Sequence, residues 1–166
     1  MARFIKFASL LLSASIIVVG CGDDDDSNST PPATKCKSPY AGATEAQLKA
    51  ATTSGACQGD TEAICKNDMI TLAATCGVSC VQTSSDALEQ AACTQSCMKM
   101  NAEPDPSDAC LTCYMLSVQC AATNCFAECA ADGNTPTCQS CRVEKGCTDA
   151  FYTCSGLPEP TADGGV

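Results

Sequence analysis

The 166-residue chain contains no histidine and no tryptophan, and aromatic residues make up only 4% of it. Without histidine the chain lacks both the Ser-His-Asp and the Cys-His arrangements of nucleophilic catalysis. Its carboxylates are scattered, with no apolar pocket in the sequence pattern that would shift a pKa. We therefore expect neither an enzymatic activity nor a bound cofactor.

Basic residues are also scarce, because nine Lys and Arg stand against nineteen Asp and Glu, for a net charge of −10. Two of the nine, Arg3 and Lys6, lie in the N-terminal twenty residues, so the remaining chain carries −12. Such a charge argues against binding to nucleic acid or to anionic lipid surfaces. Attachment to a membrane would therefore need a lipid on the protein itself.

Residues 1–20 have the three parts of an export signal. Arg3 and Lys6 give a positive start, residues 7–19 form an apolar run, and Gly20 is a small residue before a cysteine. The apolar run is shorter than the roughly 20 residues that a bilayer-crossing helix needs. We expect this segment to direct export rather than to span the membrane.

The sequence Val18-Val19-Gly20-Cys21 resembles the lipobox of bacterial lipoproteins. In that family the cysteine thiol receives a diacylglycerol, cleavage occurs just before the cysteine, and the new amino group is usually acylated. The resemblance implies that Cys21 is a lipidation site and that the mature chain is held on a membrane through this lipid; two acyl chains suffice for stable anchoring. The alternative is a plain secretory signal that ends near a cysteine.

The residue after the lipidated cysteine bears on location within the bacterial cell envelope. In the enterobacterial sorting rule, Gly22 rather than Asp at this position implies release to the outer membrane. The domain would then face either the periplasm or the outside of the cell, and the sequence leaves both placements open.

Residues 21–35 have no apolar face and include the run Asp23-Asp24-Asp25-Asp26. We expect a lipidated, acidic, disordered tether. The run lacks the turn glycine and the spaced ligands of a calcium loop, which favours a solubilising spacer over an ion site. Residues 156–166, rich in Pro and Gly, are likewise expected to be disordered.

Cysteine is the residue that the chain has in excess, with seventeen copies. Cys21 accounts for one, and the other sixteen lie in a domain over residues 36–155 whose apolar residues are largely Ala and Cys. So thin a core would leave the domain marginal without covalent links, and export makes disulfides available. Because sixteen is even, all can pair. The expected disulfide cysteines are Cys36, Cys57, Cys65, Cys76, Cys80, Cys93, Cys97, Cys110, Cys113, Cys120, Cys125, Cys129, Cys138, Cys141, Cys147 and Cys154.

Helix start and stop signals recur along this domain, and no stretch shows the alternation of a strand, so we predict an all-α fold. The second predicted helix ends at Gly77, and a loop with two prolines at residues 103–106 ends the third. The tyrosines and phenylalanines after residue 36 are expected in the core. The five predicted helices begin at Thr44, Asp60, Ser84, Ser107 and Thr135.

The cysteine spacing of residues 93–120 returns in residues 125–147. Each unit is predicted to be a helical hairpin, because cysteines three or four apart share one helix face and can close two disulfides with a second such pair. The domain is then a small disulfide-rich domain of repeated helical hairpins. The favoured pairs are Cys93 with Cys113, Cys97 with Cys110, Cys125 with Cys141, and Cys129 with Cys138. This arrangement loosely resembles α-hairpinin-type disulfide-stapled helical hairpins, a likeness of spacing that implies no activity.

A competing partition pairs Cys76 with Cys97 and Cys80 with Cys93, across the turn at residues 84–85. It would leave the first two cysteines of the next helix to find partners elsewhere. The Pro-rich loop at residues 103–106 is the clearer turn, which favours the repeat-based scheme.

These features predict a lipid-anchored, cell-envelope structural or protein-interaction module with an unknown protein partner. An alternative is soft-metal binding, because clustered thiolates near Met98 and Met100 suit copper(I) or zinc; this is weakly similar to the four-helix copper-storage proteins. A third possibility is thiol-disulfide exchange at the C-x-x-C motifs Cys110–Cys113 and Cys138–Cys141, which lie near predicted helix starts. No βαβ pattern surrounds either motif.

Overall fold

The computed structural model describes residues 33–166 and confirms an all-α, disulfide-rich domain. Within these residues, extended pairing is limited to one isolated bridge between Lys35 and Thr44. No helix in this range has the length and apolarity to cross a membrane. The predicted export signal, Cys21 and most of the tether lie outside the described residues. The helices are α1 (Glu45–Ala51), α2 (Thr61–Lys66), α3 (Met69–Thr83), α4 (Ala87–Asn101), α5 (Asp108–Asn124), α6 (Phe126–Cys129), α7 (Pro136–Glu144) and α8 (Cys147–Ser155).

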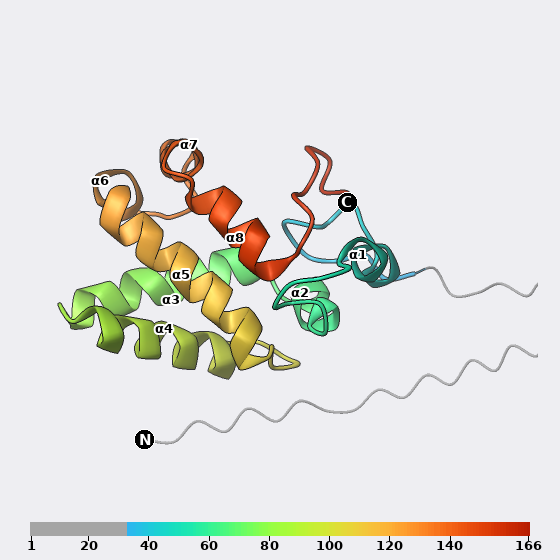
Figure 1. Ribbon diagram of the computed structural model, residues 1–166, viewed down its shortest axis with the longest axis horizontal. Helices are drawn as coiled ribbons and strands as arrows, with labels where there is room; N and C mark the ends of the chain where they lie inside the picture. Colours follow the sequence, from blue (N-terminus) through green and yellow to red (C-terminus); the bar gives the residue numbers. More distant parts are fainter. Residues whose placement is uncertain (1–32) are drawn as a thin grey trace, which may run out of the picture. The chain divides into compact units, whose positions relative to one another are not determined.

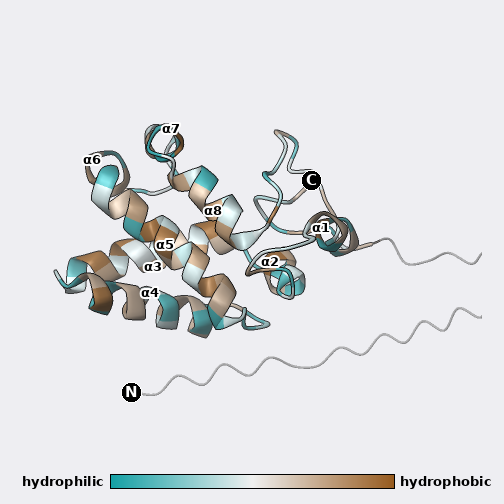
Figure 2. Cartoon of the chain, in the orientation of Figure 1, coloured by the Kyte–Doolittle hydropathy of each residue, from teal (hydrophilic) through white to brown (hydrophobic). Residues whose placement is uncertain are grey.

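Helix α5 is the centre of the domain, because it packs against α3, α4, α6, α7 and α8. Figure 1 shows α5 crossing the antiparallel pair α3 and α4, with α8 beside it. The hydrophobic colour is concentrated on α3 and α5, whereas α7 is mostly hydrophilic (Figure 2). The start of α5 is fixed by Ser107, whose Oγ accepts a hydrogen bond from the Cys110 backbone N–H at 3.2 Å.

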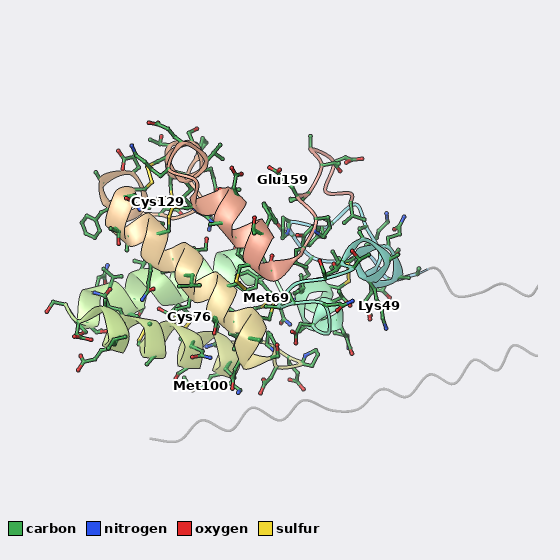
Figure 3. All side chains as sticks on the ribbon, viewed as in Figure 1. Lys49, Met69, Cys76, Met100, Cys129 and Glu159 are labelled. Carbon is green, nitrogen blue, oxygen red and sulfur yellow. A yellow bond between two sulfur atoms is a disulfide. The ribbon has the colours of Figure 1, made fainter. Side chains whose placement is uncertain are left out.

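The core contains few large side chains. Leu48, Ile64, Met69, Met98 and Leu111 are fully buried, and cysteines fill much of the remaining space. Figure 3 places Met69 and Cys76 among the packed helices, whereas Met100 projects from α4 with 79% of its surface exposed. The apolar area is therefore small for a domain of this length, as the composition predicts.

The second predicted helix is two helices in the structure, and its expected end at Gly77 is wrong. Helix α2 ends at Lys66, and α3 begins after Asp68, whose carboxylate accepts a hydrogen bond from the Thr71 backbone N–H at 3.0 Å. Gly77 lies inside α3, at a point where α5 comes close. A Cβ there would come within 2.5 Å of Val118 Cγ1 on α5, so the position requires glycine. The glycine allows a close helix crossing rather than ending a helix.

Residues 156–166 are ordered, so their expected disorder is wrong and the domain extends beyond residue 155. Leu157 is buried, with 4% of its surface exposed, and the Tyr40 hydroxyl donates a hydrogen bond to the Pro158 carbonyl at 2.8 Å. The backbone N–H of Gly42 donates to the Gly164 carbonyl at 2.9 Å. One buried leucine and these backbone bonds fix a segment whose composition alone is typical of disorder.

The three tyrosines of the chain are all at least partly buried, which predicts alkaline sensitivity. Burial raises the pKa of Tyr40 and Tyr114 strongly, and burial followed by the nearby Glu159 raises the pKa of Tyr152 to about 12. Unfolded tyrosines ionise at about pH 10, so above that pH the unfolded state binds fewer protons than the native state, and the free energy of unfolding falls as pH rises.

Titration of tyrosinate absorbance will check this expectation. In denaturant all three tyrosines should ionise near pH 10, whereas the native protein should ionise first near pH 12, at Tyr152. The Tyr152→Phe variant should lose that first native step. Ionisation of all three near pH 10 in the folded protein would contradict the burial assigned to them.

Candidate functional site

The structure joins the sixteen cysteines of the domain in eight disulfides, with Cα–Cα distances from 4.2 to 5.9 Å. Six of these form three antiparallel helix pairs with two links each, and the other two fasten the N-terminal segments. The pairs are Cys36–Cys65 and Cys57–Cys110; Cys76–Cys97 and Cys80–Cys93 between α3 and α4; Cys113–Cys154 and Cys120–Cys147 between α5 and α8; and Cys125–Cys141 and Cys129–Cys138 across α6 and α7.

The favoured pairs Cys93–Cys113 and Cys97–Cys110 are wrong, and the competing pairs across the turn at residues 84–85 are the ones present. Met98 and Thr94 occupy the buried side of α4, which directs Cys93 and Cys97 toward α3. The repeat in cysteine spacing therefore does not reflect a repeat in pairing. In residues 125–147 the favoured pairs and the observed pairs coincide.

Two cysteines of α5 pair with α8, which the sequence interpretation missed. Cys113 and Cys120 are seven residues apart, as are Cys147 and Cys154, so each pair shares one helix face. The two α6–α7 disulfides lie inside this pair in the sequence, and the spans decrease from 41 to 27, 16 and 9 residues. The sequence did contain one indication of this pairing, because the spacing of seven residues between Cys113 and Cys120 equals that between Cys147 and Cys154.

The cysteines proposed as redox or metal sites are all used in these links. Neither C-x-x-C motif closes on itself, because Cys110 and Cys113 bond to Cys57 and Cys154, and the second motif bonds to α6. Cys110, Cys113 and Cys138 are also buried. Soft-metal binding needs thiolates, and in this pairing the domain offers none.

Loop length should rank the contributions of these disulfides to stability. On the chain-entropy relation, a link spanning 53 residues, Cys57–Cys110, is worth about 4 kcal/mol, and one spanning 9 residues, Cys129–Cys138, about 2.5 kcal/mol. We expect the Cys57→Ala/Cys110→Ala variant to lose more unfolding free energy in urea than Cys129→Ala/Cys138→Ala. Equal losses, or the reverse order, would show that strain or residual unfolded structure dominates.

An apolar groove of about 310 Å³ lies on α3 and α5 and is bounded on its other side by α6, α7 and α8. Apolar residues make up most of its wall. The lining includes Ile70, Val78, Val81, Val118, Phe126 and Arg142.

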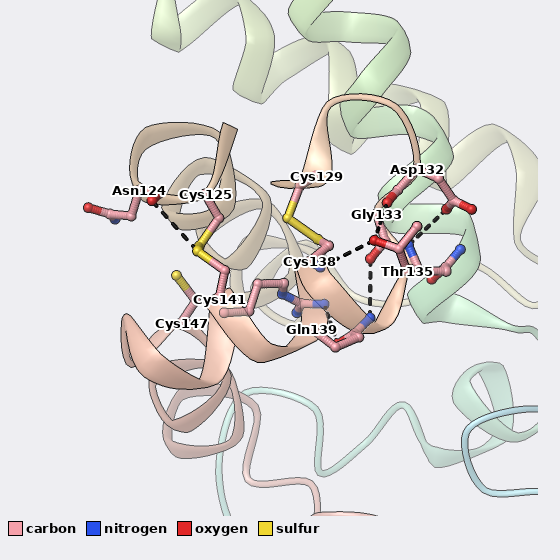
Figure 4. The surroundings of a disulfide bond; sticks show 12 residues. Asn124, Cys125, Cys129, Asp132, Gly133, Thr135, Cys138, Gln139, Cys141 and Cys147 are labelled. Carbon is pink, nitrogen blue, oxygen red and sulfur yellow. Dashed lines mark hydrogen bonds between the residues drawn. A yellow bond between two sulfur atoms is a disulfide. The ribbon is translucent and has the colours of Figure 1, made fainter. Parts of the chain in front are cut away.

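The α6–α7 unit forms one wall of the groove, and its two disulfides fix its shape. Figure 4 shows Cys129–Cys138 closing the turn, with the Thr135 Oγ accepting a hydrogen bond from the Cys138 backbone N–H. Gly133 in this turn approaches α3 so closely that a Cβ would lie 3.0 Å from the Ala74 Cβ. The wall is thus held against α3 by a close backbone contact.

Arg142 on α7 is the one charged side chain that lines the groove, and it is the only arginine in the described residues. Its Nη2 donates to Ser117 Oγ at 2.9 Å and its Nη1 donates to Gln139 Oε1 at 3.3 Å, and both acceptors are neutral. Its Nε is buried and has no hydrogen-bond partner. Burial lowers the pKa of Arg142 from its ordinary value, because no carboxylate offsets the lost hydration.

The cationic groups that form ion pairs in residues 33–166 lie elsewhere, at Lys66, Lys99 and Lys145. Sequence interpretation did not single out Arg142. The only feature of the sequence that could have drawn attention to Arg142 is that it is the lone arginine of an acidic domain. Its burial could not be predicted, because it depends on the packing of α7 against α5.

No family model, curated protein or solved structure matches this chain.

Proposed function

We propose that the chain is an exported bacterial lipoprotein, anchored through a lipid on Cys21, whose disulfide-linked domain is an interaction module of the cell envelope. The division of the cysteines carries this proposal. Sixteen pair with one another in the domain, and Cys21 is the one left for another chemistry. Eight disulfides also require an oxidising compartment, which agrees with an export signal.

The charge of the chain supports anchoring by lipid rather than by surface attraction. The four aspartates after Gly22 repel an anionic membrane surface and one another, so their charge suits a solvated spacer between lipid and domain. A covalently closed domain with a preformed groove suits a binding role, because its binding surface loses little conformational freedom when a ligand binds. Gly22 supports placement in the outer membrane under the enterobacterial rule.

Intact-mass spectrometry of the protein purified from bacterial membranes tests the anchoring. We expect the mass of residues 21–166, plus diacylglycerol and an amide-linked acyl chain, minus the sixteen hydrogens lost to eight disulfides. The Cys21→Ser variant should carry no acyl mass and should retain residues 1–20. A wild-type protein that is cleaved but unacylated would contradict the lipoprotein assignment.

Membrane fractionation tests the location separately. The wild-type protein should fractionate with the outer membrane and Gly22→Asp with the inner membrane, whereas the control Asn28→Asp, which adds the same charge within the tether, should fractionate as wild type. Fractionation of the wild type with the inner membrane would remove the outer-membrane placement and leave lipidation untouched, whereas a Gly22→Asp variant that stays in the outer membrane would show that residue 22 does not determine sorting in this bacterium.

A further inference from the structure

We propose that the groove binds a single-chain amphiphile with a carboxylate head, such as a medium-chain fatty acid. The head pairs with Arg142, and the hydrocarbon chain lies along the apolar walls of α3 and α5. This inference deepens the proposed function by giving the interaction module a ligand class. It does not require the lipid on Cys21.

The state of Arg142 indicates an anionic head. Its guanidinium already has two neutral acceptors, but a half-buried cation without a counter-charge is costly, and buried donors without partners are rare in folded proteins. A carboxylate in the groove supplies the missing charge, and its oxygens can accept from the Nη1 and Nη2 N–H groups that Gln139 and Ser117 leave free, whereas Nε is buried and out of a ligand's reach. A single cation matches a single negative charge better than it matches a phosphate dianion.

The walls indicate a hydrocarbon chain. Ile70, Val78 and Val81 on α3 and Val118 on α5 line the groove, and Phe126, with 56% of its surface exposed, is also part of the lining. An exposed phenylalanine beside an apolar groove is a surface that a hydrocarbon chain would cover. The volume of about 310 Å³ is at the lower end of the range for small-molecule pockets, which favours one chain over a two-chain phospholipid.

The preference for an anion should be local to the groove, because the rest of the domain is acidic. The nearest basic residue in sequence, Lys145, is exposed and is paired with Glu144 at 3.5 Å. Replacing Lys145 therefore changes the net charge as replacing Arg142 does, without altering the groove. This makes Lys145→Gln a matched control.

Isothermal titration calorimetry with three probes of equal chain length tests the proposal. The full-length protein is reconstituted in nanodiscs, empty nanodiscs correct for partition into lipid, and the probes are decanoate, 1-decanol and decylammonium. We expect saturable decanoate binding, weaker decanol binding and no decylammonium binding. If the three probes bind equally, or if decanoate binds no better than to empty nanodiscs, the proposal is wrong, and this result depends on no variant.

The Arg142→Gln variant assigns the head-group contact. Loss of one charged hydrogen-bonding partner should weaken decanoate binding about tenfold or more and leave decanol binding unchanged. Lys145→Gln should bind decanoate as the wild type does. If Arg142→Gln retains decanoate affinity with an unchanged circular dichroism spectrum, Arg142 does not bind the head, and the proposal fails. The acyl mass of Cys21 is measured independently, so failure of binding and failure of anchoring are separate outcomes.

Discussion

Covalent pairing of cysteines is the constraint on which this structure depends. The domain has few large apolar side chains, so hydrophobic burial alone would leave it near the limit of stability. Each disulfide adds about 2 to 4 kcal/mol. Helix α5 is held by three of these disulfides, because Cys110, Cys113 and Cys120 link it to the segment before α2 and to α8. The links to α8 and the two that join Cys138 and Cys141 of α7 to Cys129 and Cys125 tie together the elements that bound the groove opposite α3.

Local features of the fold were predictable because the residues that determine them are close in sequence. Three of the predicted helix starts cap helices in the structure: Thr44 forms a capping box with Gln47, Ser107 caps α5, and Thr135 caps α7. The Cys125–Cys141 and Cys129–Cys138 links follow from spacing for the same reason, since their hairpin is short. Pairings between distant helices depend on which face of each helix is buried, and sequence spacing alone does not determine that.

The misses have a common origin in tertiary packing. Glycine commonly ends a helix, but Gly77 instead allows a close helix crossing, and that role depends on Val118, which lies on another helix. The last eleven residues have a composition typical of disorder, yet they are ordered, because Leu157 is buried and because Tyr40 and Gly42 donate hydrogen bonds to carbonyl groups of this segment. The groove was likewise missed, because Arg142 becomes a site residue only when α7 packs against α5. A cysteine-rich sequence of this kind therefore predicts that its cysteines pair more readily than it predicts the grooves on its surface.

The disulfides also determine how the domain would respond to a force applied at its N-terminal end. A pull on the chain there would enter at Cys36, cross to Cys65, follow the short stretch 57–65 back to Cys57, and cross to Cys110. From there residues 110–113 lead to Cys113 and its link with Cys154. The covalent path from the first domain cysteine to the last thus runs through two short stretches of backbone. The domain is nearly inextensible along this path, and a load applied at its N-terminal end would be carried by covalent bonds rather than by the packing that shapes the groove.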